Sequence, residues 1–364
     1  MSFIICGTLL PPEVEQILPG ASPAAGKYLR NMERALQRKG IEVIEMSYVA
    51  IPGAKEAFEK AGKSDEDITY KDKTIIRSIK DYQKKVIKTL QKDDVVVFYN
   101  IVYFDLGLIN KIKRRGNKAI LILADFTDSL SENGNYKRWV VSRFIAREFK
   151  KFDYGIALSE RAKRFFLPKA KLIVMEGGIN YSDYEDYKPL IKSDVVRFMY
   201  AGTLSYVTGI DTLLDAISMV SADNVEFYIS GKGELDQRVS EEAKKDKRIK
   251  YLGFVSDKQY YALLNDVDVL INPRNMTLLQ NQNNFPSKVL EYLATGREVI
   301  STKFPGWERF ADNFRFYEGG AEALKTEINK SLSDDLGLHY VINRSKAEGF
   351  DWNKQINKVI ELIS

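Results

Sequence analysis

Short runs of β-forming residues alternate with longer stretches of helical periodicity along this chain of 364 residues. In the first half the β-type runs are residues 3–6, 42–46, 95–99, 119–124, 155–158 and 171–175, and the helical stretches between them are 23–39, 74–91, 106–115, 136–152 and 159–166. This alternation predicts βαβ units, in which the strands form a parallel sheet and the helices cover its faces.

The same pattern resumes after a polar, irregular stretch at 181–193, which we interpret as a linker. The second set of β-type runs is 195–200, 225–229, 249–252, 267–271 and 299–301, with helical stretches at 209–220, 234–245, 256–265, 287–295 and 320–332. The predicted fold class is therefore α/β, with two doubly wound domains joined near residue 190. Because open parallel sheets bind ligands at the carboxyl ends of their strands, we expect the site in a central cleft between the domains.

The composition excludes several classes of site and partner. One cysteine, Cys6, rules out an internal disulfide, and one histidine, His339, rules out a histidine-rich metal site. The net charge of +5 is too small over this length to indicate a nucleic-acid partner. Apolar runs such as 119–124 are far shorter than the ~18 residues of a membrane span, and no signal peptide is recognisable. We therefore expect a cytoplasmic protein.

Glycines follow three consecutive strands of the second domain, at Gly202, at Gly231 and Gly233, and at Gly253. A single glycine after a strand usually marks only a turn. Three such positions at one edge of a sheet favour a surface where backbone approaches a ligand closely. Neither a Walker loop nor a G-x-G-x-x-G fingerprint is present.

The segment 283–300 predicts an anion site at the start of a helix. Pro286 and Ser287 suit a helix start and Gly296 suits its end, so the first-turn N–H groups would face a ligand. Lys288 in that turn is unfavourable for the helix dipole unless an anion lies beside it. Glu291, one turn further on, would reach hydroxyl groups of the same ligand. The alternative is an ordinary buried helix with a solvated lysine.

At these residues the chain resembles a family-4, retaining, nucleotide-sugar-dependent glycosyltransferase of the GT-B fold. The segments that carry the resemblance are Tyr200-Ala-Gly-Thr203, Gly209-Ile-Asp-Thr-Leu-Leu-Asp-Ala216, Ile229-Ser-Gly-Lys-Gly-Glu234, Tyr251-Leu-Gly-Phe-Val255, Val269-Leu-Ile-Asn-Pro-Arg274, Phe285-Pro-Ser-Lys288 and Glu291-Tyr-Leu-Ala-Thr-Gly296. The resemblance implies two Rossmann-like domains, 1–190 for the acceptor and 191–348 for the donor. A last helix, 349–364, would cross back to the first domain.

The resemblance also implies roles for individual donor-binding residues. Glu291 would bind the nucleotide ribose, and the backbone of Phe285, Pro286, Ser287 and Lys288 would hold the diphosphate. Gly253, Phe254 and Val255 would lie beside the base, and Gly202 would let the backbone approach the phosphates. Thr203, Gly231, Lys232 and Asn283 complete the donor site that we predict, with no metal and no cofactor, and with a UDP-linked sugar as the expected donor.

Three positions depart from the family pattern. Asn283 stands where the family has a glutamate that contacts the donor sugar, and Thr203 and Thr208 stand where it has an arginine and a lysine. Charge that develops on the leaving diphosphate must still be stabilised. Arg274 is our first candidate for this role because arginine binds phosphate bidentately, followed by Lys288 and then Lys232.

The family often has a histidine after the fourth strand of the first domain, where this chain has Asp125 and Asp128. Either carboxylate would orient the acceptor hydroxyl or accept its proton, and either would equally cap the next helix. We place Asp125 with Arg274 and Lys288 among the candidate catalytic residues. His339 lies in the C-terminal helical region, and we expect it to be a surface or packing residue.

Three other functions were weighed. A metal-dependent transferase would use Asp266 and Asp268 as an Asp-x-Asp pair, but this pair lies where a helix runs into a strand. The departures at Asn283, Thr203 and Thr208 would suit a non-catalytic partner subunit that supports another glycosyltransferase. A nucleotide-sugar epimerase has less support, because no convincing pair of catalytic acids is present.

The helix predicted at 136–152 bears on the acceptor. Trp139, Arg143, Arg147 and Lys150 share one side of it, as in helices at membrane surfaces. Residues 111–171 hold sixteen basic and six acidic side chains, so the small net charge conceals a basic region. We expect a hexosyltransferase that acts on a saccharide or lipid-linked saccharide in surface-polysaccharide or glycolipid assembly, peripheral to the inner face of the cell membrane. The alternative for the helix at 136–152 is a solvated face with one exposed tryptophan.

Overall fold

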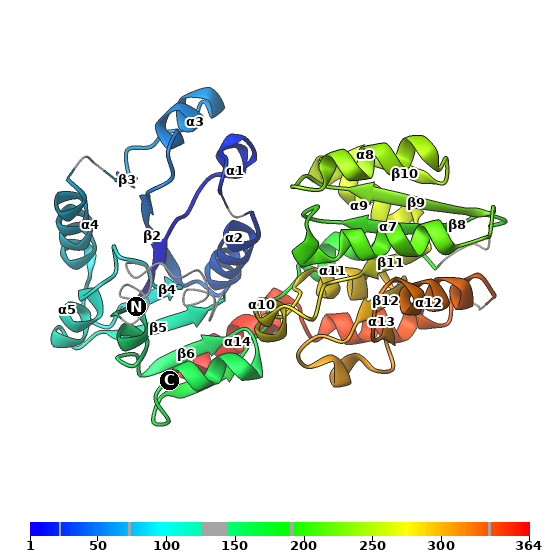
Figure 1. Cartoon of the computed structure of the whole chain (residues 1–364). Coiled ribbons are helices and arrows are strands. Elements are labelled where there is room, and N and C mark those ends of the chain that lie inside the picture. The colour runs from blue at the N-terminus through cyan, green and yellow to red at the C-terminus, as the bar shows by residue number, and fades with distance from the viewer. Residues whose placement is uncertain (22, 72–73, 125–143, 190–192, 334–335) are drawn as a thin grey trace. The chain divides into compact units, whose positions relative to one another are not determined.

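The chain forms two compact units in the computed structural model, which describes residues 1–21, 23–71, 74–124, 144–189, 193–333 and 336–364 (Figure 1). Unit 1 comprises Met1–Gly178 together with Trp352–Ser364, and unit 2 comprises Ile179–Asp351. No helix among the described residues is long and apolar enough to cross a membrane.

The described residues of unit 1 form a seven-stranded parallel sheet in the order β3-β2-β1-β4-β5-β6-β7. The strands are β1 (Ser2–Gly7), β2 (Glu42–Val49), β3 (Thr69–Tyr70), β4 (Val95–Tyr99), β5 (Lys118–Leu123), β6 (Tyr154–Ala157) and β7 (Lys171–Val174). The helices are α1 (Pro12–Ile17), α2 (Pro23–Arg38), α3 (Ala54–Ala61), α4 (Ile75–Thr89), α5 (Leu108–Arg114), the 3₁₀ helix η2 (Glu160–Phe165) and α14 (Trp352–Ile363).

Alternate side chains of the central strand β1 enter two different cores. Ile4 and Cys6 belong to one apolar cluster, and Phe3 and Ile5 belong to the other. Successive side chains of a strand point to opposite faces, so a strand that is apolar throughout is buried only when helices cover both faces. The continuous apolar pattern of the sequence is thereby explained.

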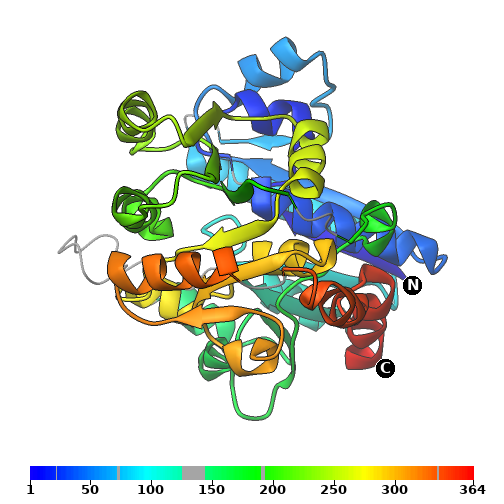
Figure 2. The same cartoon turned by 90° about the vertical axis from the view of Figure 1, so that its right-hand side faces the viewer.

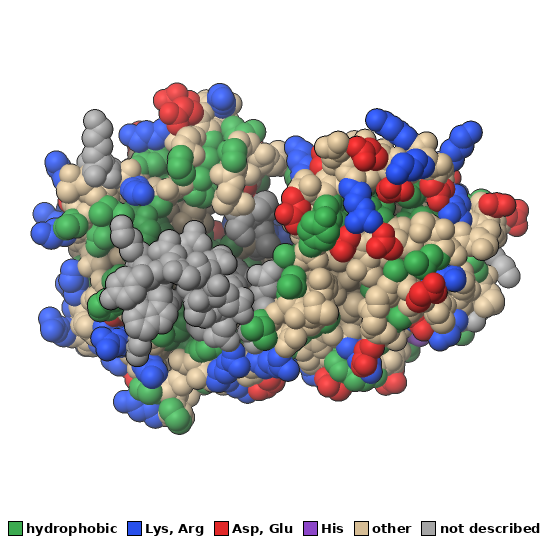
Figure 3. All heavy atoms as spheres, viewed as in Figure 1, with side chains coloured by type: hydrophobic (Ala, Val, Ile, Leu, Met, Phe, Trp, Pro, Cys, Tyr) green, Lys and Arg blue, Asp and Glu red, His purple; other side chains and the backbone are tan. Residues whose placement is uncertain are grey.

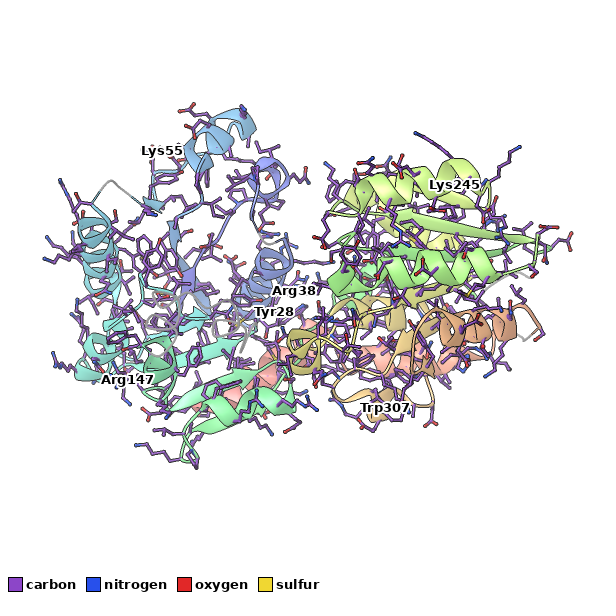
Figure 4. The ribbon with its side chains drawn as sticks, viewed as in Figure 1. Tyr28, Arg38, Lys55, Arg147, Lys245 and Trp307 are labelled. Carbon is purple, nitrogen blue, oxygen red and sulfur yellow. The ribbon has the colours of Figure 1, made fainter. Side chains whose placement is uncertain are left out.

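The last helix, α14, is part of unit 1. Its first residue, Trp352, is buried, and its indole packs edge-on against Tyr28 of α2 with 5.0 Å between ring centroids. Arg38, at the end of α2, donates to Asn353 at 3.4 Å (Tyr28 and Arg38 are labelled in Figure 4). The chain thus returns to unit 1 after completing unit 2.

The described residues of unit 2 form a six-stranded parallel sheet in the order β10-β9-β8-β11-β12-β13. The strands are β8 (Val196–Ala201), β9 (Val225–Ser230), β10 (Ile249–Gly253), β11 (Val269–Asn272), β12 (Glu298–Thr302) and β13 (Arg315–Tyr317). The helices are α7 (Ile210–Met219), α8 (Asp236–Lys245), α9 (Asp257–Asp266), α10 (Leu279–Asn283), α11 (Lys288–Thr295), α12 (Ala321–Ser333) and α13 (His339–Glu348), with 3₁₀ helices η3 (Tyr181–Tyr184), η4 (Tyr206–Thr208) and η5 (Trp307–Phe310).

Helices cover both faces of this second sheet (Figure 2). Apolar residues of α7, α8 and α12 pack on one face, and those of α9, α11 and α13 pack on the other. This is the doubly wound arrangement that the sequence predicts, in both units.

The stretch interpreted as a linker, 181–193, is partly folded into unit 2. Tyr184 is 1% exposed, and its carbonyl accepts a hydrogen bond of 2.6 Å from Arg344 of α13. The carbonyl of Tyr187 accepts the hydroxyl of Tyr340. The linker interpretation is therefore wrong for residues 181–187, because the tyrosines that make this stretch look irregular supply buried ring area.

Several short elements lie outside the predicted ones. The additional helices include α1, α3 and α10, the additional strands are β3 and β13, and the predicted helix at 159–166 is the 3₁₀ helix η2. Of the helix predicted at 136–152, residues 144–149 are helical, and residues up to 143 lie outside the described part of the chain. Two- and three-residue strands at sheet edges leave too little periodicity to be recognised.

Candidate functional site

The order of the second sheet places β8 beside β11 at its centre, while the chain winds outward in opposite directions from these two strands. In doubly wound sheets such a switch point leaves a crevice at the carboxyl ends of the two strands. Here the loops at this point are 202–209, after β8, and 273–278, after β11. The candidate donor-binding residues all belong to unit 2.

Two glycines let these loops pack against each other. Gly209 has a φ of +75°, and a Cβ added there would lie 1.9 Å from the carbonyl oxygen of Pro273. A Cβ on Gly231 would lie 1.7 Å from the carbonyl oxygen of Gly202. Part of the glycine pattern that we interpret as a ligand surface is thus explained by backbone packing between loops. Gly253, by contrast, has a φ of +64° and open space around it.

The loop after β8 is held by hydroxyl groups. The carbonyl of Thr203 accepts hydrogen bonds of 2.6 Å from both Tyr200 and Thr208. Thr208 also forms a reciprocal capping box with Ser205 at the start of η4. Thr208 therefore stiffens the loop at the position where the resemblance leads one to expect a lysine.

Lys288 points back toward the end of β8. Its ammonium group donates a hydrogen bond of 2.6 Å to the carbonyl of Ala201 and lies 5.4 Å from the centre of the Tyr260 ring. It is also 3.8 Å from the position that a Cβ on Gly202 would occupy. The structure thus places this cation beside Gly202, at the switch point, rather than in bulk solvent.

Glu291 lies one turn further along α11 and is half-buried. Its Oε2 accepts a hydrogen bond of 2.9 Å from the hydroxyl of Tyr260, which comes from α9. Burial and the charge of Glu291 raise the pKa of Tyr260 well above its usual value, so the tyrosine stays protonated and donates. The carboxylate is thus held in one orientation.

Arg274 follows β11 and is held at two points. Its Nε donates a hydrogen bond of 2.6 Å to Oδ1 of Asn281 in α10, and its carbonyl accepts from the Thr302 hydroxyl at 3.0 Å. The carbonyl carbon of Arg274 lies 3.4 Å from the position that a Cβ on Gly209 would occupy. Arg274 thus lies in the loop after β11, next to the loop after β8, while Lys288 points at the end of β8.

In the segment before α11 we expect the backbone, rather than the side chains, to hold the ligand. Phe285 is buried and its ring packs against Phe304 and Phe310, at 5.3 and 6.0 Å between centroids. The amides of Val289 and Leu290 donate to the carbonyls of Pro286 and Ser287. These bonds use two of the first-turn N–H groups that we expect an anion to occupy. Ser287 is exposed and its hydroxyl does not cap the helix, while the side chain of Asn283 lies outside what the structure describes.

The loop after β10 presents an aromatic ring. Phe254 is 55% exposed, and the ammonium group of Lys232 lies 5.2 Å from its ring centre. Val255, the next residue, is half-buried. An exposed ring with a cation beside it can stack on a nucleobase.

Asp268 and His339, two positions considered in the sequence analysis, have structural partners. Oδ2 of Asp268 accepts a hydrogen bond of 2.7 Å from the amide of Arg197. His339 pairs with Glu298 at 2.5 Å, and this hydrogen bond raises the pKa of the imidazole. Within the described ranges, no group of three or more histidine, cysteine or acidic residues could hold a metal ion.

Four residues named in the sequence analysis, Asp125, Asp128, Trp139 and Arg143, lie outside the described residues. The structure does describe the residue before them: the amide of Ala124 donates to Oδ1 of Asn100 at 2.9 Å. Asn100 itself has a φ of +58° at the end of β4.

Sequence reasoning missed Tyr260 and Asn281, which hold Glu291 and Arg274. The helix predicted at 256–265 already contains Tyr260, but nothing in the sequence pairs this helix, α9, with α11. Nor does anything in the sequence mark Asn281, the partner of Arg274.

Comparison with known proteins adds to this picture. Residues 196–334 match the family model described as "Glycosyl transferases group 1". No protein with a curated description matches the chain.

Solved structures resemble the chain over its whole length. The Anabaena protein Alr3699/HepE, in complex with UDP, has a TM-score of 0.72 and 16% identity, covering 99% of this chain and 100% of its own. A glycosyltransferase from Rickettsia africae ESF-5 has a TM-score of 0.69 and 17% identity, covering 99% and 97%. WaaG, a glycosyltransferase involved in lipopolysaccharide biosynthesis, has a TM-score of 0.67 and 14% identity, covering 100% and 99%. The fold is therefore the GT-B fold, as the sequence predicts.

Proposed function

We propose that this chain is a retaining, metal-independent glycosyltransferase that moves a hexosyl group from a nucleotide-diphosphate sugar to a saccharide or lipid-linked saccharide. The observation that carries the proposal is the arrangement at the switch point of unit 2. There Lys288 points at the end of β8, Arg274 lies in the neighbouring loop after β11, both are held by hydrogen bonds, and Glu291 follows Lys288 one turn along α11.

The chemistry of each group suits this reaction. Two cations neutralise the charge that develops on the leaving diphosphate, which is the part that a metal ion plays in other transferases. The guanidinium of Arg274 can hold two phosphate oxygens, whereas the ammonium of Lys288 acts as a point charge. The carboxylate of Glu291 accepts hydrogen bonds from ribose hydroxyls. Asp125 remains our candidate for orienting the acceptor hydroxyl.

A uridine nucleotide is the donor that we propose first. The structurally similar Alr3699/HepE carries UDP, and another similar structure is the lipopolysaccharide outer core galactosyltransferase WaaB. The exposed ring of Phe254 supplies a stacking surface for the base. We place the reaction, on the same grounds, in the assembly of surface polysaccharide or glycolipid.

For the acceptor side, we propose that unit 1 contacts an anionic membrane surface from the cytoplasm. Lys and Arg side chains are frequent on the visible surface of this unit (Figure 3). Lys111 and Arg114 of α5 and the following Arg115 are exposed. Arg147 and Lys150 are also exposed, and Phe144 beside them is 53% exposed (Arg147 is labelled in Figure 4). Cations around an exposed aromatic ring suit a lipid interface.

A thermal-shift panel tests the donor assignment. Wild-type protein is heated with UDP-, GDP- and dTDP-sugars in turn, and a ligand that binds only the folded state stabilises it by about 2.7 kcal/mol at a hundred times its Kd. We expect a shift with one donor, lost in Glu291→Ala, and turnover that persists in EDTA. If none of the nucleotide sugars raises the melting temperature, the second candidate is favoured, which is a non-catalytic partner subunit. The structural use of Thr208 in place of a cation also suggests this candidate.

A further inference from the structure

Tyr260 joins the two charged residues of α11. It lies in the first turn of α9, whose start is fixed by the capping box of Ser256 and Gln259. Its hydroxyl reaches Glu291 Oε2 at 2.9 Å, and the face of its ring lies 5.4 Å from the ammonium group of Lys288. One side chain thus contacts a carboxylate with its tip and a cation with its ring.

The two contacts have different chemistry. A carboxylate only accepts hydrogen bonds, so the tyrosine hydroxyl must donate, and the raised pKa of Tyr260 keeps the proton on it. The ring face attracts the ammonium group through its negative quadrupole. Lys288 and Glu291 are three residues apart on α11, so one side chain from α9 contacts both of them.

We propose that Tyr260 is a positioning residue that makes the site selective for ribonucleotides. Its hydroxyl orients Glu291 toward the ribose hydroxyls, and its ring keeps Lys288 directed at the end of β8, where the diphosphate lies. This inference rests on the proposed function, because it assigns parts of a nucleotide to the two residues.

Ligands that share only part of UDP distinguish the contact of the Tyr260 hydroxyl with Glu291 from the contact of its ring with Lys288. The dissociation constants of UDP, 2′,3′-dideoxy-UDP and inorganic pyrophosphate are measured by calorimetry for wild-type protein, Tyr260→Phe and Tyr260→Leu. We expect Tyr260→Phe to weaken UDP about tenfold, the size of a lost hydrogen bond to a charged group, and to change dideoxy-UDP and pyrophosphate less than twofold. Tyr260→Leu, which also lacks the ring, is expected to weaken all three ligands.

Tyr228→Phe is the matched control. The hydroxyl of Tyr228 donates to Glu226 at 2.9 Å, so the same chemical change is made at a carboxylate outside the site. We expect this variant to bind all three ligands like wild type.

The outcomes distinguish the two levels of the proposal. If wild type binds neither UDP nor the corresponding guanosine and thymidine diphosphates, the proposed function fails and this inference fails with it. If wild type binds UDP but Tyr260→Phe keeps the full preference for UDP over dideoxy-UDP, only the inference is overturned. Equal losses on both nucleotides in Tyr260→Phe would show a packing role and would also overturn it.

Discussion

Nε of Arg274 lies 2.6 Å from Oδ1 of Asn281, a side chain with no solvent exposure. The amide nitrogen of Asn281 donates to the carbonyls of Val207 and Asn275, at 2.7 and 2.6 Å. Because both donors are used, the amide cannot turn over, and its oxygen must face the guanidinium. A neutral buried residue therefore fixes the cation that we assign to the diphosphate, and it ties together the loops after β8 and β11.

Asn281→Ala tests this support. The substitution removes the anchor of Arg274 and the hydrogen bonds of the Asn281 amide to the carbonyls of Val207 and Asn275, which costs about 1–3 kcal/mol in the free energy of unfolding. We expect kcat to fall by more than KM rises, since a loosened arginine binds the developing charge less well than a fixed one. The control is Gln282→Ala, at the next residue of α10, which removes one hydrogen bond to the carbonyl of Met276. Equal kcat losses in the two variants would contradict a specific role for Asn281.

Lys288→Met tests the second cation. Methionine keeps the apolar stem of the side chain but removes the charge beside Gly202, so we expect kcat to fall about 10²–10³-fold. Lys245→Met, at an exposed lysine paired with Glu242 on α8 (Lys245 is labelled in Figure 4), provides the matched control and should leave turnover unchanged. Steady-state kinetics measure both variants, after circular dichroism has confirmed that each is folded. Full activity in Lys288→Met would exclude the assigned role.

The architecture was open to prediction because it follows from patterns along the chain. Strands buried on both faces are apolar, as β4 is and as β5 is after Lys118, and the helices between them are long enough to show their period. The edge strands β3 and β13 have two and three residues, which is too short for any period. The return of α14 to unit 1 was expected from the resemblance rather than from the residues.

The candidate site was predictable only where local geometry carries it. Lys288 and Glu291 follow from the start of a helix, and Arg274 follows from the end of a strand. Tyr260 and Asn281 became visible only in the folded chain. Tyr260 contacts Glu291 on another helix, 31 positions away, and Asn281 contacts Arg274 in the preceding loop, 7 positions away. The glycines are not all evidence of a ligand surface, because Gly209 and Gly231 are needed where one loop packs against another.

Gly209→Ala tests that structural explanation of the glycines. A methyl group there meets the carbonyl oxygen of Pro273 at 1.9 Å on a backbone with positive φ, so we expect a loss of about 2–4 kcal/mol in the free energy of unfolding. Gly253→Ala has the same strained φ but open space, and about 1 kcal/mol is expected there. Urea denaturation of the two variants measures the difference. Equal losses would mean that the backbone conformation, not the contact with Pro273, requires the glycine.

Charge reversal tests the membrane surface of unit 1. We expect wild-type protein to sediment with vesicles of anionic phospholipid at low salt, and the double variant Arg147→Glu, Lys150→Glu to lose most of this binding. The same reversal at Lys244 and Lys245 of α8, in unit 2, keeps the net charge equal to that of the first variant and should leave sedimentation unchanged. Equal effects of the two double variants would point to net charge alone.

Asp105 gives unit 1 a pH-dependent stability. Burial raises the pKa of this carboxyl to about 7, although Val102 and Tyr48 donate hydrogen bonds to Oδ2 at 3.1 and 3.3 Å. A folded-state pKa above the unfolded one favours the folded state at low pH, and this contribution is lost as the pH rises from about 4 to about 7. Three pKa units correspond to a loss on the order of 4 kcal/mol.

Asp105→Asn removes this titration while keeping an oxygen for the two donors. Relative to wild type, we expect the variant to gain stability steadily between pH 4.5 and pH 7 and then to keep a constant advantage, because wild type must bury a charge above pH 7 and the amide need not. Urea denaturation of both proteins at several pH values measures the difference, in which other titrating groups cancel. A stability difference that does not change with pH would show that Asp105 keeps the same charge in the folded and unfolded states.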